Sequence, residues 1–118
     1  MKIWCDGGNP KQGKYCVVTE RGKIIRGKEK GCTNNELEYK AMIKALEIAK
    51  DGDVIYSDSK LVVNQILGWW RINSESLGEL CEKCKEILKN KKVKIVWIPR
   101  RRNRAGKILE SQKLKTVR

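Results

Sequence analysis

The sequence contains no histidine among its 118 residues. It therefore lacks the side chain that most often acts as an acid or base near neutral pH and that most often binds metal ions. Mechanisms in which histidine activates a serine or a cysteine nucleophile are excluded. This absence favours acid–base chemistry by carboxylates or by water bound to a metal ion.

Long hydrophobic runs are also missing, since no segment approaches the roughly 18 apolar residues that a membrane-spanning helix needs. No basic segment followed by an apolar stretch resembles a signal peptide at the N-terminus. The five cysteines include one CxxC pair, Cys81 and Cys84, with no second pair and no histidine to complete a zinc site. This pair is more typical of two thiols on one helix face. We expect a reducing, cytoplasmic location and no membrane partner.

Acidic residues are scarce relative to basic ones: 14 stand against 27, which gives a net charge of +13. A positive charge of this size on a small chain favours a polyanionic partner, and nucleic acid is the first candidate. A chain of this length with 40% hydrophobic residues can bury a core without disulfide bonds. We expect one globular domain over residues 1–118 and a monomer, because no feature of the sequence implies a protein partner.

The spacing of apolar residues predicts the element order βββαβααβα. Apolar runs bounded by turn-forming residues predict strands at 2–5, 15–19, 23–26, 54–57 and 93–98. A period of about 3.6 residues predicts helices that begin near residues 35, 59, 74 and 103, with Asn103 as the cap of the last one. This order predicts an α/β fold with a mixed five-stranded sheet, three antiparallel strands followed by parallel ones, flanked by helices.

Three acidic residues stand where a predicted strand ends or a helix begins. Asp6 follows the first strand, Asp58 follows the fourth, and Glu38 lies in the first turn of the first helix. If these two strands are parallel neighbours, their carboxyl ends bring the three carboxylates together. Such a group repels itself unless a cation lies within it, which predicts a divalent-metal site with oxygen ligands. Taken singly, each of these residues has a simpler interpretation, an aspartate in a turn or a glutamate at the start of a helix. The prediction of a metal site therefore depends on the three residues together.

Four segments together resemble ribonuclease H of the type 1 class. They are Asp6-Gly7-Gly8-Asn9-Pro10, Thr33-Asn34-Asn35 with Glu38-Tyr39 and Ala41, Tyr56-Ser57-Asp58-Ser59, and Trp97-Ile98-Pro99 followed by Asn103 and Leu109. The resemblance covers nearly the whole chain, and that family's fold has the element order predicted above. It implies cleavage of the RNA strand of an RNA/DNA hybrid, leaving 3′-hydroxyl and 5′-phosphate ends. It also implies that Asp6, Glu38 and Asp58 are the catalytic carboxylates and that they bind Mg²⁺ or Mn²⁺, with two ions in the active complex.

The sequence departs from this family in its last helix and in the loop before it. The family's fourth carboxylate falls on Lys107, or on Gly106 if one residue is gapped, and neither is an acid. Glu110, one turn further along, is a candidate fourth metal ligand, and its simpler interpretation is an exposed residue that offsets nearby lysines. Alternatively, the Lys107 ammonium replaces part of the second ion's charge. The family's loop histidine is absent too, and residues 100–102 are arginines, which hold phosphate but cannot act as bases.

The resemblance also implies which residues hold the substrate. On the RNA side these are Gly7, Gly8, Asn9, Asn35 and the Glu38 carboxylate; on the DNA side they are Thr33, Asn34 and Asn73. Around them we expect Lys60, Trp70, Arg71, Arg102 and Asn103 to contribute, with one residue of the Trp69-Trp70 pair in the core and the other lining the groove. The simpler interpretation of residues 33–35 is a cluster that caps the helix.

Two rival functions stay open at this point. One is a hybrid- or duplex-binding module of the same fold with weak or no catalysis, which the missing fourth carboxylate suggests. The other is a nuclease of the same fold that acts on double-stranded RNA or DNA. Three mutually repelling acids favour an enzyme, because a binding module has no need of them.

Overall fold

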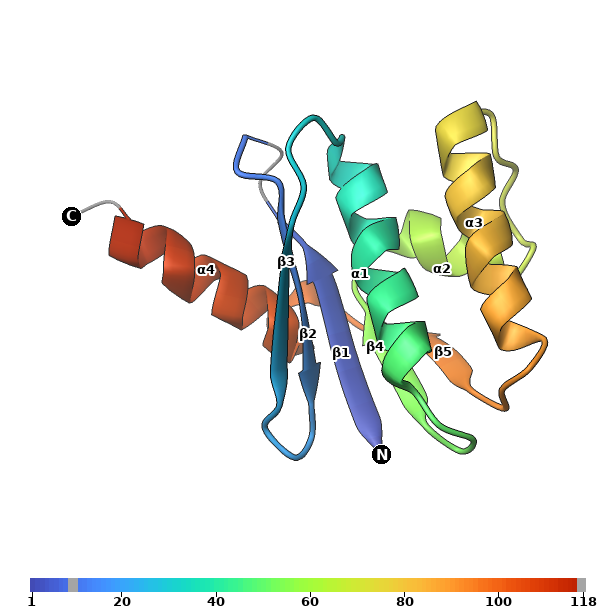
Figure 1. Ribbon diagram of the computed structural model, residues 1–118, viewed down its shortest axis with the longest axis horizontal. Helices are drawn as coiled ribbons and strands as arrows, with labels where there is room; N and C mark the ends of the chain where they lie inside the picture. The colour runs from blue at the N-terminus through green and yellow to red at the C-terminus, as the bar shows by residue number, and fades with distance from the viewer. Residues whose placement is uncertain (9–10, 117–118) are drawn as a thin grey trace.

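The computed structural model describes residues 1–8 and 11–116, with side chains as far as residue 111. Its centre is a five-stranded sheet in the order β3-β2-β1-β4-β5 (Figure 1). β1 pairs antiparallel with β2, which pairs antiparallel with β3, whereas β4 and β5 run parallel to β1. The strands are β1 (Lys2–Gly7), β2 (Lys14–Thr19), β3 (Ile24–Lys28), β4 (Val54–Ser57) and β5 (Lys94–Trp97). The predicted element order and the predicted mixed sheet are confirmed.

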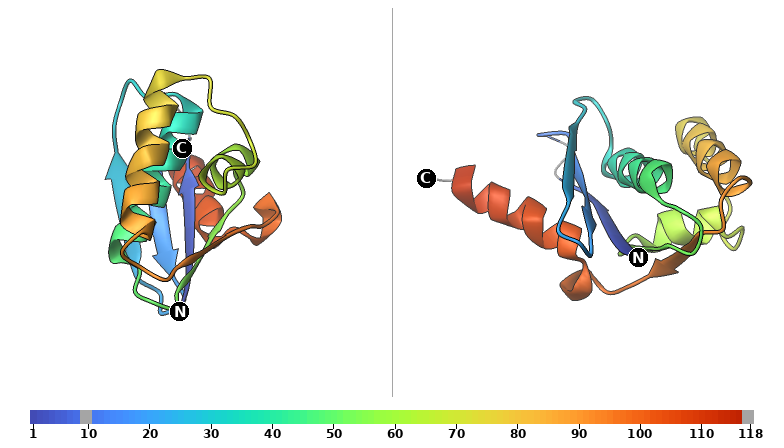
Figure 2. Two further views of the ribbon diagram at one scale, coloured as in Figure 1. Left: turned by 90° about the vertical axis from the view of Figure 1, so that its right-hand side faces the viewer. Right: turned by 60° about the horizontal axis from the view of Figure 1, so that its bottom comes forward.

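The helices cover the two faces of the sheet unequally. Three lie on one face, and the fourth packs on the other (Figure 2). They are α1 (Asn34–Ile48), α2 (Lys60–Ile66), α3 (Glu75–Leu88) and α4 (Arg104–Thr116), the last preceded by a short 3₁₀ helix, η1 (Arg100–Arg102). Among the described residues, no helix combines the length and the apolar composition that crossing a membrane requires.

Local capping explains where the helices begin. Thr33, Ser59 and Ser74 each accept a hydrogen bond from a backbone N–H in the first turn of α1, α2 and α3, respectively. These bonds satisfy donors that the helix itself leaves unpaired. The predicted helix starts therefore agree with the structure, because the caps are short-range features of the sequence.

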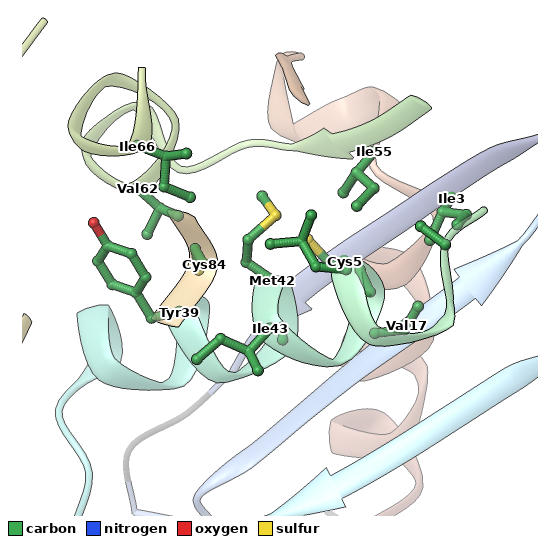
Figure 3. Packing of buried hydrophobic residues seen from close by; sticks show 14 of the residues in the cluster. Ile3, Cys5, Val17, Tyr39, Met42, Ile43, Ile55, Val62, Ile66 and Cys84 are labelled. Carbon is green, nitrogen blue, oxygen red and sulfur yellow. The ribbon is translucent and has the colours of Figure 1, made fainter. Parts of the chain in front are cut away.

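Two hydrophobic clusters form because successive strand residues point to opposite faces. Ile3, Cys5 and Val17 pack with α1, α2 and α3 around Met42 and make up part of the larger cluster (Figure 3). Their neighbours along the strands, Trp4, Cys16 and Val18, point to the other face. Ala105, Ile108 and Leu109 of α4 cover them there. The helix α4 is therefore fixed over the β1–β2 half of the sheet.

Candidate active site

The sheet register places Asp6 and Asp58 next to each other. β1 and β4 are parallel and pair Lys2 with Val54, Ile3 with Ile55 and Trp4 with Tyr56. Asp6 and Asp58 each lie two residues beyond the last of these pairs, at the carboxyl ends of neighbouring strands. Ligand sites in open α/β sheets form at such ends.

Glu38 reaches the same point from α1 because β1 ends unusually close to that helix. The Gly7 backbone N–H donates to Glu38 Oε1 at 2.6 Å. A Cβ atom on Gly7 would lie 2.4 Å from the backbone of Leu37 and Glu38, so only glycine permits this approach. The glycine after Asp6 thus fixes the distance between the strand and the helix.

The three carboxylates form one cluster. Each of Asp6, Glu38 and Asp58 offers an oxygen, and these oxygens all lie within 4.8 Å of one another. Asp6 and Glu38 are buried. Burial first, and then the neighbouring Asp58 charge, raises the pKa of Asp6 to about 7. Burial and the Asp6 charge raise the pKa of Glu38 to about 9, against the opposing effect of the Gly7 N–H.

These raised pKa values have a simple physical meaning. Like charges that share a partly desolvated site cannot all ionise without a compensating cation. Three hard carboxylate oxygens at this spacing suit Mg²⁺ or Mn²⁺, which prefer oxygen ligands. Asp6, Glu38 and Asp58 therefore fit a divalent-metal site.

Asn103 lies beneath this cluster and is fully buried. Its side-chain Nδ2 donates to Asp58 Oδ2 at 3.0 Å and to the Cys5 backbone oxygen at 2.9 Å, while its Oδ1 accepts from the Ala105 N–H at 3.1 Å. The cap function predicted for this residue is confirmed by the last bond. The predicted direct contact with substrate is not what the structure shows, because the carboxamide is enclosed and holds Asp58 instead.

Trp97 holds Asp58 from the other side. Its indole Nε1 donates to the Asp58 backbone oxygen at 3.0 Å. The Lys60 ammonium lies 4.9 Å from the centre of the same indole ring, a distance at which a cation is attracted to the ring face. Lys60 is exposed, so its charge faces solvent at the edge of the site.

A cavity of about 280 Å³ opens beside Asp6. Its wall includes Gly7, Gly8 and Asn34 from the predicted substrate residues, together with Gly106 and Glu110 of α4. The remaining lining residues are Gln12, Lys14, Arg100 and Leu109. The predicted fourth ligand, Glu110, therefore faces the cavity that contains Asp6, although it is exposed and is not part of the three-carboxylate cluster.

Gly106 is the α4 residue that abuts Asp6. A Cβ atom on it would lie 3.1 Å from Asp6 Oδ2, which is tight. Lys107 is exposed and lines an adjoining surface pocket with Arg101. Lys107 and Gly106 are the two positions where the family's fourth carboxylate was expected. Of these, Gly106 is the one that lies beside the carboxylate cluster.

The other predicted substrate residues surround the site at the surface. Thr33 caps α1 in a reciprocal arrangement: its hydroxyl accepts from the Glu36 N–H, and the Glu36 carboxylate accepts from the Thr33 N–H. Of residues 33–35, Thr33 thus caps α1; it is also exposed, so its substrate contact stays a prediction. Asn35 is half-buried, whereas Arg71, Asn73 and Arg102 are exposed; Asn9 lies outside the described residues.

The expectation for the tryptophan pair is wrong in one respect. Both rings are exposed, Trp69 by 76% and Trp70 by 48%, so neither packs in the core. They follow α2, where Gly68 adopts a positive φ of 82°. The turn at this glycine ends the helical repeat, which is why helical spacing does not predict their direction.

The sequence prediction did not include the cavity residues Gln12 and Lys14. It assigned phosphate binding to the whole run of residues 100–102 and named Arg102 as a substrate residue, whereas Arg100 is the member of the run that lines this cavity. Three successive arginines carry no signal of which one faces inward, because that depends on the orientation of η1. Lys14 begins β2 directly after the loop that contains Gly7 and Gly8, and this position in the sequence could have indicated that it lies near the site.

Comparisons with known proteins agree with this fold. The family model described as RNase H matches residues 1–106. The ribonuclease H of Helicobacter acinonychis is 34% identical over 112 aligned positions, which cover 83% of this chain and 78% of the relative. The RNase H1 of the halophilic archaeon Halobacterium salinarum superposes with a TM-score of 0.75 at 27% identity, with 92% of each chain covered. LC11-RNase H1, solved in complex with an RNA/DNA hybrid, gives 0.75 at 26% identity over 87% of this chain and 88% of the other.

Proposed function

This chain belongs to the RNase H family, and we propose that it hydrolyses the RNA strand of RNA/DNA hybrids to leave 3′-hydroxyl and 5′-phosphate ends. The observation that carries the proposal is the cluster of Asp6, Glu38 and Asp58, whose carboxylate oxygens lie within 4.8 Å of one another. Three carboxylates this close repel one another unless a cation lies between them, so their clustering in a protein with a net charge of +13 points to metal binding. The hybrid bound in the LC11-RNase H1 structure supports the choice of substrate.

Asp6, Glu38 and Asp58 would hold two Mg²⁺ or Mn²⁺ ions in the active complex, with Glu110 as a further ligand. When bound, such ions activate water and stabilise the charge that develops on the phosphate and on the leaving oxygen. The chain's own contribution is geometry. Asn103 fixes the Asp58 carboxylate, and the Gly7 N–H fixes Glu38, so both ligands are oriented before substrate arrives.

The RNA strand would be recognised at the glycine loop and at the start of α1. Gly7, Gly8, Asn35 and the Glu38 carboxylate offer hydrogen-bonding groups there, and the 2′-hydroxyl is the group that distinguishes RNA from DNA locally. Gly8 and Asn34 line the cavity beside Asp6, which places this surface next to the metal ligands. Asn9 belongs to the same prediction.

The DNA strand would lie along the exposed polar and basic residues beyond α1 and α2. Thr33, Asn34 and Asn73 would contact its phosphates, and Trp70 and Arg71 would offer an aromatic face and a charge. Lys60 and Arg102, both exposed near the site, would add backbone contacts. Affinity should therefore fall steeply as the salt concentration rises.

One assay tests the proposal directly. The protein is incubated with an RNA/DNA hybrid, with double-stranded RNA and with duplex DNA, in Mg²⁺ and separately in Mn²⁺. We expect cleavage of the RNA in the hybrid and none after Asp58→Asn, which removes a ligand charge but keeps the side-chain shape. Binding of hybrid without cleavage in either metal would favour a binding module instead.

That second candidate is kept because Gly106, and not an acid, faces Asp6. A site with three clustered carboxylates holds less negative charge for a second ion than a site with four. Cleavage of double-stranded RNA or of duplex DNA at a rate similar to that of the hybrid would identify the other rival, a nuclease with a different substrate.

We also propose that the enzyme acts as a monomer in the cytoplasm. All five cysteines are free thiols, and Cys5, Cys16, Cys81 and Cys84 are buried, which suits a reducing compartment. Sedimentation at assay concentration should give the mass of one chain.

A further inference from the structure

The cavity beside Asp6 contains positive charge as well as negative charge. Lys14 reaches it from the start of β2 and Arg100 from η1, whereas the neighbouring Arg101 and Arg102 are not among its lining residues. The Arg100 charge is felt by Asp6, since it opposes the rise in that residue's pKa. One arginine of the three-residue run is therefore distinguished by its position at the carboxylate cluster.

A phosphodiester that approaches three carboxylates meets strong repulsion. A guanidinium in the same cavity offsets it, and its planar fork of N–H donors matches two phosphate oxygens at once. Arginine remains protonated at neutral pH, so a role as acid or base is excluded. The chemistry available to Arg100 is to bind and orient a phosphate beside Asp6.

Gly106 provides room for this contact. It forms part of the same cavity wall, and it carries no side chain between Asp6 and the open space. Arg100 and Gly106 lie on either side of Asn103, which anchors η1 and α4 to β1 and Asp58 through its buried hydrogen bonds. The arginine is thus attached to the segment that also positions a metal ligand.

We propose that Arg100 is a catalytic residue that binds the phosphate of the RNA strand at or next to the cleaved linkage. This inference rests on the proposed function for its kinetic consequence, but the contact itself can be tested by binding alone. It differs from general attraction by the basic surface, because it assigns one side chain to one phosphate.

The kinetic test compares Arg100→Ala and Arg100→Lys with two charge-matched controls. Arg101→Ala removes the same charge from the same turn, and Arg21→Ala removes it from the exposed β2–β3 turn. Loss of a charged hydrogen bond predicts a fall in kcat of roughly 10- to 100-fold for Arg100→Ala. Arg100→Lys should recover part of the rate. Arg101→Ala should change mainly KM, by less than about threefold, and Arg21→Ala should match the unaltered protein.

The binding test locates the phosphate. The affinity for hybrid is measured with Asp58→Asn, which should not cleave it. Each hybrid in the series carries one uncharged methylphosphonate linkage, placed on a 2′-deoxynucleotide, at a different position along the RNA strand. With Arg100 present, affinity should fall most, by roughly tenfold, at one linkage. In the Arg100→Ala variant, a methylphosphonate at that linkage should lower the affinity no more than one at any other linkage. The losses of affinity at the other linkages should be unchanged.

Several results would overturn the inference. Equal effects of Arg100→Ala and Arg101→Ala on kcat and KM would show that only general charge matters. An unchanged methylphosphonate profile in Arg100→Ala would show that another residue holds the phosphate. If the unaltered protein fails to cleave hybrid, the proposed function fails, and the methylphosphonate profile still decides whether Arg100 contacts one phosphate. A melting temperature within about 2 °C of the unaltered protein would confirm that these variants are folded.

Discussion

Replacement of Asn103 by alanine tests whether the active site is held by one buried carboxamide. The side chain makes three hydrogen bonds, to the Cys5 oxygen, to Asp58 Oδ2 and from the Ala105 N–H. At about 1 kcal/mol for each bond, the free energy of unfolding should fall by about 3 kcal/mol. For a domain of this size, that corresponds to a decrease in melting temperature of about 12 °C. The change also frees Asp58, so hybrid cleavage should fall further than stability alone explains.

Urea unfolding and differential scanning calorimetry on the metal-free protein measure the first effect. Asn103→Asp is the sharper variant, because it keeps the shape and the capping acceptor but replaces the donor to Asp58 with a second carboxylate. It should destabilise the metal-free protein at pH 8, and Mg²⁺ should recover part of the loss. Asn90→Ala is the matched control, since the Asn90 side chain is exposed and donates one long hydrogen bond, at 3.5 Å, to the Glu86 backbone oxygen.

The reasoning would be refuted if Asn103→Ala lost less than about 1 kcal/mol, or no more than Asn90→Ala. It would also be refuted if Asn103→Ala kept full cleavage activity and full affinity for Mn²⁺. Either result would mean that Asp58 is positioned by its own backbone, through Trp97, and that the carboxamide contributes little.

Three further predictions concern the cluster and the exposed rings. The pKa values of about 7 for Asp6 and about 9 for Glu38 lie above the ordinary values of 3.8 and 4.5 for these side chains, so between these limits the metal-free fold binds more protons than the unfolded chain. Its free energy of unfolding should therefore fall as pH rises from 5 to 9, by up to about 1.4 kcal/mol per pH unit for each contributing group: both carboxyls contribute below about pH 7, and Glu38 alone contributes above it. Glu38→Gln should flatten this dependence in urea titrations. Gly106→Ala should weaken Mn²⁺ binding measured by calorimetry, because its Cβ would meet Asp6 Oδ2 at 3.1 Å, whereas Gly78→Ala in α3, where the nearest atom lies at 3.8 Å, should stabilise the fold by about 0.5–1 kcal/mol. Trp70→Ala should weaken hybrid binding by about 1–3 kcal/mol, because its exposed ring offers a stacking face, and Trp69→Ala should leave the melting temperature unchanged.

Each of these has a clear contrary result. Stability of the metal-free protein that is constant or rises with pH would contradict the repulsion within the cluster. Equal Mn²⁺ affinity for Gly106→Ala and Gly78→Ala would show that Asp6 accommodates a methyl group. A decrease in melting temperature for Trp69→Ala would show that the ring supports the fold.

The fold was predictable from the sequence because its determinants are local. Alternating residues in β1 and β2, and capping residues such as Thr33 and Ser59, act within a few positions of themselves. The convergence of Asp6 and Asp58 also followed, since it needs only that two predicted strands be parallel neighbours.

The details of the site needed the tertiary structure. Asn103 and Cys5 are 98 positions apart, so no local pattern shows that they are bonded or that the same carboxamide holds Asp58. The exposure of Trp69 depends on the turn at Gly68, and the choice of Arg100 over Arg102 depends on how η1 sits on the sheet. In each case the physical cause is a contact between segments that the sequence does not pair.

The origin of the carboxylates along the chain has a consequence for its synthesis. All three clustered acids lie in the first half of the sequence, whereas the buried bond to Asp58 comes from Asn103, near the start of the last helix. An unfinished chain therefore carries every clustered acid before it can hold them in place. We therefore expect a product truncated before Asn103 to lack this bond and to hold Asp58 less firmly than the full chain does.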